Sequence, residues 1–114
     1  MKQAPSKEAS MRRRYAALRK QLRRVGWISE GYVQDRGPGA GGPCYQWTRK
    51  LKGKTVSVAL SEEQYQWLKA AIENWKSLQM ILREMQQLSR TELFHTVPGP
   101  PRRKRLPKKV LGIK

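Results

Sequence analysis

The first part of the chain carries apolar residues at helical spacing on a polar and basic background. The apolar positions are Met11, Tyr15, Leu18, Leu22 and Val25. They follow one another at intervals of four and three residues, which places all of them on one stripe of an α-helix. Ser10 is a suitable N-cap and Gly26 a suitable left-handed stop. We therefore expect a helix over about residues 11–25.

The next stretch changes to the alternating pattern of β-strands. We expect strands over residues 27–36, with Gly31 as a bulge, over 44–50 and over 54–60. The intervening residues 37–43 are almost all glycine and proline and form a loop, while Lys52-Gly53 signals a tight turn. Antiparallel pairing around that turn sets Trp47 against Val56 or Val58, a favourable aromatic–β-branched pair.

A long helical pattern follows the third strand. Ser61 and Gln64 form a capping box, and neither Gly nor Pro interrupts the chain up to about Ser89. The main apolar stripe is made of Tyr65, Leu68, Ile72, Trp75, Leu82 and Met85. A helix of this length exceeds what three strands cover, so its second half must pack on the first helix, on a second copy or on another partner. The candidate docking stripe consists of Leu78, Ile81, Leu82, Met85 and Leu88.

These elements predict an α+β fold. It has an N-terminal basic helix, a three-stranded antiparallel β-meander, a long C-terminal amphipathic helix and a disordered basic tail. We expect a flexible arm over residues 1–9, one small domain over 10–93 and a Pro-rich tail over 94–114. Prolines among the tail cations exclude a continuous helix there.

The net charge of +17 on 114 residues lies mainly at the two ends of the chain. Residues 1–25 hold +8 and residues 94–114 hold +7, whereas residues 61–93 are nearly balanced at −1. Self-repulsion of this size destabilises a compact chain unless a polyanion neutralises it, and nucleic acid is the first candidate. The candidate phosphate contacts at the two ends are Arg12, Arg13, Arg14, Arg19, Lys20, Arg23, Arg24, Arg102, Arg103, Lys104, Arg105, Lys108 and Lys109.

The hairpin adds basic residues interleaved with aromatic ones. Its candidate nucleic-acid contacts are Arg49, Lys50, Lys52 and Lys54, with Tyr45 and Trp47 as candidate stacking residues. Bases stacked on an exposed sheet face would each contribute about 1–3 kcal/mol. The alternative, which we favour, is that Tyr45 and Trp47 face the long helix as core.

The composition argues against an enzyme. One cysteine, Cys44, and one histidine, His95, are too few for a zinc site within one chain, and Glu62 and Glu63 are explained as residues of a helix N-terminus. We expect no metal, no cofactor and no small-molecule substrate. No apolar run resembles a secretory signal or a membrane span, so we expect a cytoplasmic protein, with no membrane partner, that could associate with the nucleoid.

Several stretches together resemble a family of small, basic, uncharacterised bacterial proteins often encoded beside transposase genes. The residues that carry the resemblance are Gly42-Pro43-Cys44-Tyr45-Gln46-Trp47-Thr48-Arg49, Gly53-Lys54-Thr55, Ala71-Ile72-Glu73-Asn74-Trp75, Met85 and the ending Arg102–Gly112. Cys44 departs from the aromatic residue expected at its position. The resemblance covers roughly residues 12–112, and it implies a mobile-element setting but no reaction.

From these patterns we expect a sequence-tolerant nucleic-acid-binding protein, with DNA favoured over RNA, that acts as an accessory to a transposase or mobile element. The first alternative is a protein-interaction module that dimerises, or docks on an acidic partner such as the transposase, through its long helix. A weaker alternative is a ribosome-associated protein that binds rRNA, because the charge suits both nucleic acids.

Overall fold

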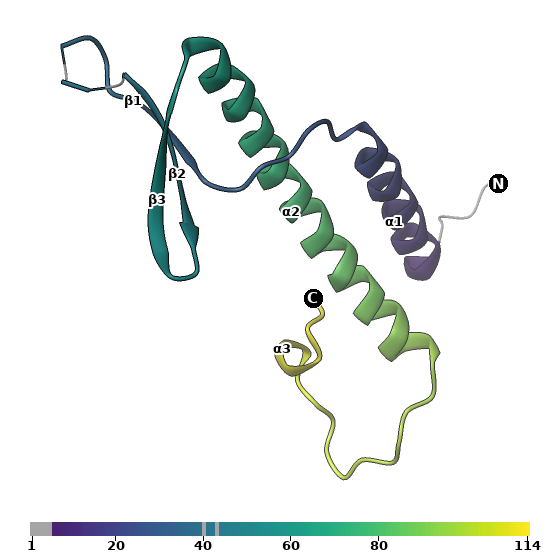
Figure 1. The fold of residues 1–114 in the computed structure, drawn as a ribbon. Helices are drawn as coiled ribbons and strands as arrows, with labels where there is room; N and C mark the ends of the chain where they lie inside the picture. The colour runs from purple at the N-terminus through teal and green to yellow at the C-terminus, as the bar shows by residue number, and fades with distance from the viewer. Residues whose placement is uncertain (1–5, 40, 43) are drawn as a thin grey trace. The chain divides into compact units, whose positions relative to one another are not determined.

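A computed structural model describes residues 6–39, 41–42 and 44–114 of the chain. The element order is one helix, three strands of an open antiparallel sheet, a long helix and a final helical turn, an α+β fold as predicted (Figure 1). The chain divides into two compact units. Unit 1 comprises Met1–Arg24 and Gln79–Lys114, and unit 2 comprises Val25–Leu78.

Helix α1 spans Lys7–Arg24 and begins four residues earlier than predicted. The Ala9 amide donates a hydrogen bond to the Ser6 hydroxyl oxygen (3.1 Å), so Ser6 is the N-cap and Ser10 lies inside the helix. Glu8 in the first turn suits the positive end of the helix dipole. Helix therefore replaces the last three residues of the expected arm, and residues 1–5 lie outside the described part of the chain.

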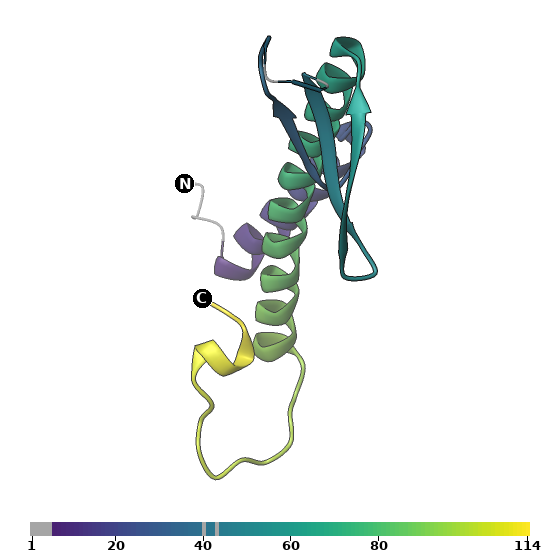
Figure 2. The ribbon, with the colours of Figure 1, turned by 60° about the vertical axis from the view of Figure 1, so that its left-hand side comes forward.

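The sheet of unit 2 has the strand order β1-β2-β3, with β1 at Tyr32–Asp35, β2 at Tyr45–Leu51 and β3 at Lys54–Leu60 (Figure 2). The predicted hairpin is confirmed, because Trp47 lies opposite Val58 and the turn falls at Lys52-Gly53. The first strand is shorter than predicted. Residues 27–31 instead run along the long helix, where the Ser29 amide donates to the carbonyl oxygen of Ala71 (3.2 Å).

Gly31 allows the indole of Trp47 to lie against the chain just before β1. Gly31 has a φ of +108°, and a Cβ atom there would clash with the Trp47 side chain and the Thr48 carbonyl. The Trp47 indole N–H donates to the carbonyl oxygen of Glu30 (3.1 Å). Position 31 therefore requires glycine for two reasons, the positive φ and the lack of space for a Cβ atom.

We expect Gly31→Ala to destabilise unit 2 by about 1–3 kcal/mol, because a strained φ and a steric clash add. Urea unfolding followed by tryptophan emission measures the change. Gly37→Ala is the matched control, since Gly37 also has a positive φ (+74°) but has no neighbouring atom within 4 Å of an added Cβ. Equal losses in the two variants would contradict the role of the Trp47 contact.

Helix α2 spans Glu62–Thr96 and has 35 residues. The predicted capping box is confirmed: the Gln64 amide donates to Ser61 Oγ (3.1 Å), and the Ser61 amide donates to Gln64 Oε1 (3.0 Å). The helix continues seven residues beyond the predicted end, since nothing before Pro98 breaks it and a residue before proline disfavours the helical conformation. Its first half contributes the buried residues Ala71 and Ile72 to unit 2.

In unit 1, α1 lies antiparallel to the second half of α2 (Figure 1). Leu18, on the predicted apolar stripe of α1, is the most buried large side chain, at 1% exposure. Other members of that stripe, Met11, Tyr15 and Leu22, are half-buried. The second half of α2 thus packs on the first helix, one of the three arrangements expected for it.

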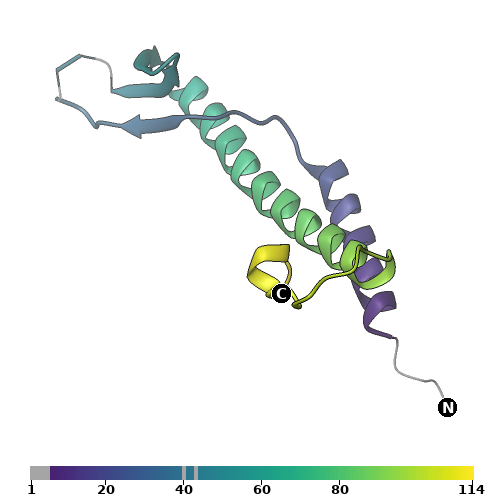
Figure 3. The same ribbon diagram turned by 90° about the horizontal axis from the view of Figure 1, so that it is seen from below.

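The tail does not remain extended to its end. Residues 97–107 have no helix or strand, as predicted, but Lys108–Leu111 form a single turn, α3, between Pro107 and Gly112. Gly112 adopts the left-handed conformation that ends a helix (φ 72°), and its carbonyl accepts a hydrogen bond from Arg90 Nε of α2 (2.7 Å). The tail is therefore a loop attached to α2 at both of its ends (Figure 3).

Candidate nucleic-acid interface

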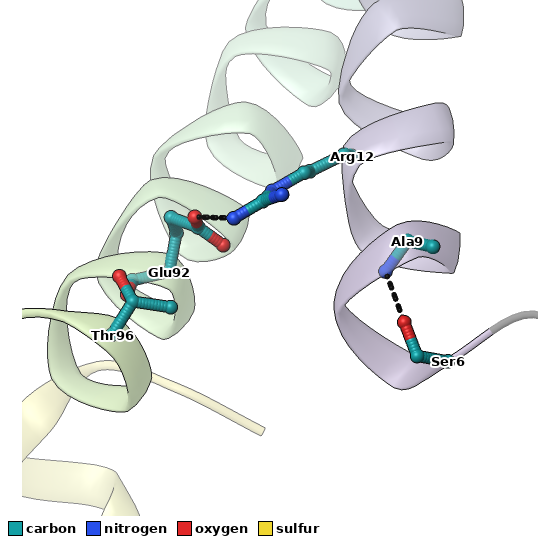
Figure 4. A network of polar contacts seen from close by, with 5 residues as sticks. All are labelled: Ser6, Ala9, Arg12, Glu92 and Thr96. Carbon is teal, nitrogen blue, oxygen red and sulfur yellow. Dashed lines mark hydrogen bonds and ion pairs between the residues drawn. The ribbon is translucent and has the colours of Figure 1, made fainter.

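Two of the candidate phosphate contacts on α1 are engaged inside unit 1. Arg12 Nη2 lies 2.8 Å from Glu92 Oε1 of α2 (Figure 4). Arg14 forms a bidentate ion pair with Glu84: its Nε donates to Oε2, and its Nη2 donates to Oε1 (3.0 Å). Hydrogen bonding to Arg14 lowers the pKa of the Glu84 carboxyl, and the two glutamates raise the pKa of their arginine partners. Because α1 begins at Lys7, Arg12 and Arg14 lie beyond its first turn, and their pairs with Glu92 and Glu84 give them a role within unit 1.

The other five candidate phosphate contacts on α1 are exposed. Arg13, Lys20, Arg23 and Arg24 project on the side of the helix away from Leu18, since successive residues turn by about 100°. Arg19 lies beside the apolar stripe, near Arg12. Among the described residues none of these five cations has a carboxylate within 4.0 Å. Their charge is available to an external anion.

The tail supplies the second group of free cations. All six candidate residues of the tail are exposed, and none is within 4.0 Å of an acid in the described part of the chain. They belong to unit 1, as do the cations of α1. The six are Arg102, Arg103, Lys104, Arg105, Lys108 and Lys109.

The charge of the chain is segregated between the two units. Unit 1 contains eighteen Lys and Arg against three Glu, a net charge of +15. Unit 2 contains seven Lys and Arg against five acids, a net charge of +2. Two sequence segments that are 54 residues apart, Met1–Arg24 and Gln79–Lys114, are brought together to produce this concentration.

The hairpin aromatics are half-buried in unit 2. The rings of Tyr45 and Tyr65 of α2 lie 4.8 Å apart between centroids, and desolvation raises the pKa of the Tyr45 phenol. Trp47 is half-buried, its N–H is bonded to Glu30, and the Arg49 guanidinium lies 5.3 Å from the centre of its ring. The Tyr45 ring thus lies against Tyr65 of α2, whereas the contacts of Trp47 are with Glu30 and Arg49.

The hairpin cations belong to a different unit from the other candidate phosphate contacts. Arg49 lies over Trp47, while Lys50, Lys52 and Lys54 are exposed near the turn. All four belong to unit 2. The structure thus joins α1 and the tail in one unit, and does not join the hairpin to them.

Sequence reasoning missed an exposed aromatic pair in unit 2. Trp27 and Trp67 have ring centroids 6.2 Å apart and are 75% and 54% exposed. The segment that carries Trp27 is fixed to α2, because Asn74 Nδ2 donates to the Trp27 carbonyl (2.9 Å). The available signal was that Trp67 lies off the apolar stripe of α2, where a large ring has no core to enter.

The candidate docking stripe of α2 is largely used within the molecule. Leu78, Ile81, Met85 and Leu88 are half-buried, and Leu88 lines a hollow of about 400 Å³ together with Met11 and Tyr15 of α1. Leu82 is exposed. More exposed than any of these is Met80, at 68%, which lies outside the stripe.

The remaining residues considered for catalysis or metal binding are Cys44 and His95. Cys44 is an exposed free thiol, and His95 lies in the last turn of α2. Within residues 6–39, 41–42 and 44–114, no three His, Cys, Asp or Glu side chains group as metal ligands. In the same part of the chain, no helix is both long and apolar enough to cross a lipid bilayer.

The comparisons with known proteins add no family to this geometry. No protein-family profile, curated protein or solved structure matches the chain.

Proposed function

We propose that the chain binds nucleic acid through unit 1, by contacts to backbone phosphates that do not read base sequence. The observation that carries the proposal is the segregation of charge, with +15 of the +17 in one unit. Lys and Arg contacts to phosphates release condensed counterions and confer affinity regardless of sequence.

The exposed face of α1 suits this role because a helix sets its cations at a regular spacing. The row from Arg13 to Arg24 spans about 16 Å of helix. One strand of B-DNA presents about five phosphates over such a length along its axis. The helical backbone of α1 sets the spacing of the outward cations, and Arg12–Glu92 and Arg14–Glu84 are ion pairs between α1 and α2.

The resemblance to proteins encoded beside transposase genes favours DNA as the polyanion and an accessory role in a mobile element. In this proposal the protein acts in the bacterial cytoplasm and performs no reaction of its own. The docking alternative, in which α2 binds a partner, is weakened because α1 uses much of the apolar length that motivated it.

Fluorescence anisotropy with labelled single- and double-stranded DNA and RNA tests the proposal, with tryptophan emission recorded in the same titration. Trp27, Trp47, Trp67 and Trp75 all lie in unit 2. We expect anisotropy to rise, most for DNA, while tryptophan emission stays unchanged, because the phosphates contact unit 1.

Two other outcomes have definite meanings. Quenching of tryptophan in proportion to binding would move the interface to unit 2, where bases would stack on Trp27 or Trp67. Tighter binding to RNA than to DNA would favour the ribosome-associated alternative.

A further inference from the structure

The loop over residues 97–107 surrounds a hollow at the end of α2. Its volume is about 390 Å³, within the range of small-ligand sites. Four cations line it: Arg102, Lys104, Arg105 and Lys108. Phe94, in the last turn of α2, adds an aromatic ring that is 37% exposed.

The electrostatics of this hollow favour an anion. None of its described lining residues is acidic, and none of its four cations lies within 4.0 Å of a carboxylate in the described residues. Like charges around one cavity repel one another until an anion neutralises them. The loop is joined to α2 at both ends, by continuity of the chain at one end and by the Arg90–Gly112 hydrogen bond at the other.

The apolar part of the lining narrows the class of anion. Phe94, Leu106, Leu111 and Ile113 offer a surface that inorganic phosphate does not need. A nucleotide combines the two requirements, because its base has a flat π-face and its phosphate is charged. A paired base in a duplex keeps its faces covered by its neighbours, whereas an unpaired base has a face free for Phe94.

We propose that this hollow binds one unpaired nucleotide, with the base against Phe94 and the phosphate between the tail cations. The proposal rests on the proposed function, since it makes the tail selective for unpaired nucleotides within a surface that otherwise accepts any backbone. An unpaired nucleotide can come from two sources. One is the end or overhang of a nucleic-acid strand, and the other is a free nucleoside monophosphate.

The first experiment compares a blunt DNA duplex with an overhang duplex of the same number of nucleotides, by anisotropy at one salt concentration. The full chain is expected to bind the overhang duplex about tenfold more tightly. Phe94→Ala should lose this preference and retain its affinity for the blunt duplex. Leu93→Ala is the matched control, because Leu93 is exposed on the same helical turn and does not line the hollow.

A second experiment tests binding of a free nucleotide, and it uses the unmodified protein, so it does not depend on the folding of a variant. The chain has a single Phe, so selective labelling gives one set of ring resonances in NMR spectra of the unmodified protein. Deoxyadenosine monophosphate is expected to shift the Phe94 ring resonances, and inorganic phosphate is expected to leave them in place. Phe94→Leu, which keeps apolar contacts but removes the aromatic face, should also lose the preference for the overhang.

The outcomes separate this proposal from the proposed function. Equal affinity for both duplexes, together with unmoved Phe94 resonances, overturns the nucleotide site while sequence-tolerant binding stands. A nucleotide shift at Phe94 without binding to any oligonucleotide keeps the site for a free nucleotide and overturns the proposed function. A preference for the overhang that survives Phe94→Ala also overturns the site.

Discussion

The affinity of the chain for a DNA duplex is expected to fall by about 10³–10⁵-fold between 50 and 200 mM salt, as for a protein that contacts about 6–10 phosphates. Among its candidate contacts, unit 1 offers enough cations without an acidic partner in the described residues, five on α1 and six in the tail. Anisotropy titrations over a salt series give the slope of log K against log salt. A flat slope would remove the basis of the proposed function.

Variants test which surface produces the salt dependence of DNA binding. Replacing Arg13, Lys20, Arg23 and Arg24 by Gln is expected to reduce its magnitude by about 3–4, because each lost phosphate contact contributes about 0.9. The matched control replaces Arg36, Lys50, Lys52 and Lys54 of unit 2, which removes the same charge. Equal reductions by both sets would show that net charge matters and the face of α1 does not.

Leu18→Ala is expected to destabilise unit 1 by about 2–5 kcal/mol. Leu18 is 1% exposed, so the substitution removes buried apolar surface and leaves a cavity. Such a loss is a large part of the 5–15 kcal/mol that stabilises a typical domain. Urea unfolding followed by circular dichroism should show an earlier transition, because α1 and the second half of α2 are helical.

Tryptophan emission separates the two units in the same experiment. All four tryptophans belong to unit 2, so their transition should move less than the helical signal does. Met80→Ala is the control, since Met80 also belongs to unit 1 but is 68% exposed and should change stability by less than about 0.5 kcal/mol. If Leu18→Ala and Met80→Ala shifted the transition equally, Leu18 would not be the core of the unit.

The parts of the fold that the sequence predicted correctly are determined by nearby residues. The capping box at Ser61 and Gln64 and the turn at Lys52-Gly53 each depend on residues only a few positions apart. Helix ends were predicted less well because local signals were ambiguous there. Ser6 and Ser10 are both acceptable caps, and nothing in the sequence before Pro98 marks an end for α2.

The sequence located the basic residues of the candidate interface, but it did not show which of them form ion pairs. Sequence counted seven cations on the first helix as free, whereas Glu92 and Glu84 engage Arg12 and Arg14 from 80 and 70 residues away. The return of the tail to Arg90 and the pairing of Trp27 with Trp67 depend equally on tertiary folding. Periodicity and composition describe single segments, so they do not reveal such contacts.

In the proposed complex with nucleic acid, the joining of the tail to α2 at both ends would affect the rate of dissociation. A free tail would offer its cations from a large volume, so a released phosphate would have a low chance of meeting the next one. Fixing residues 97–107 at both ends raises the effective concentration of each cation around a phosphate held by its neighbour. Rebinding then competes with escape, and opening the loop should shorten the residence time of the complex more than it slows association.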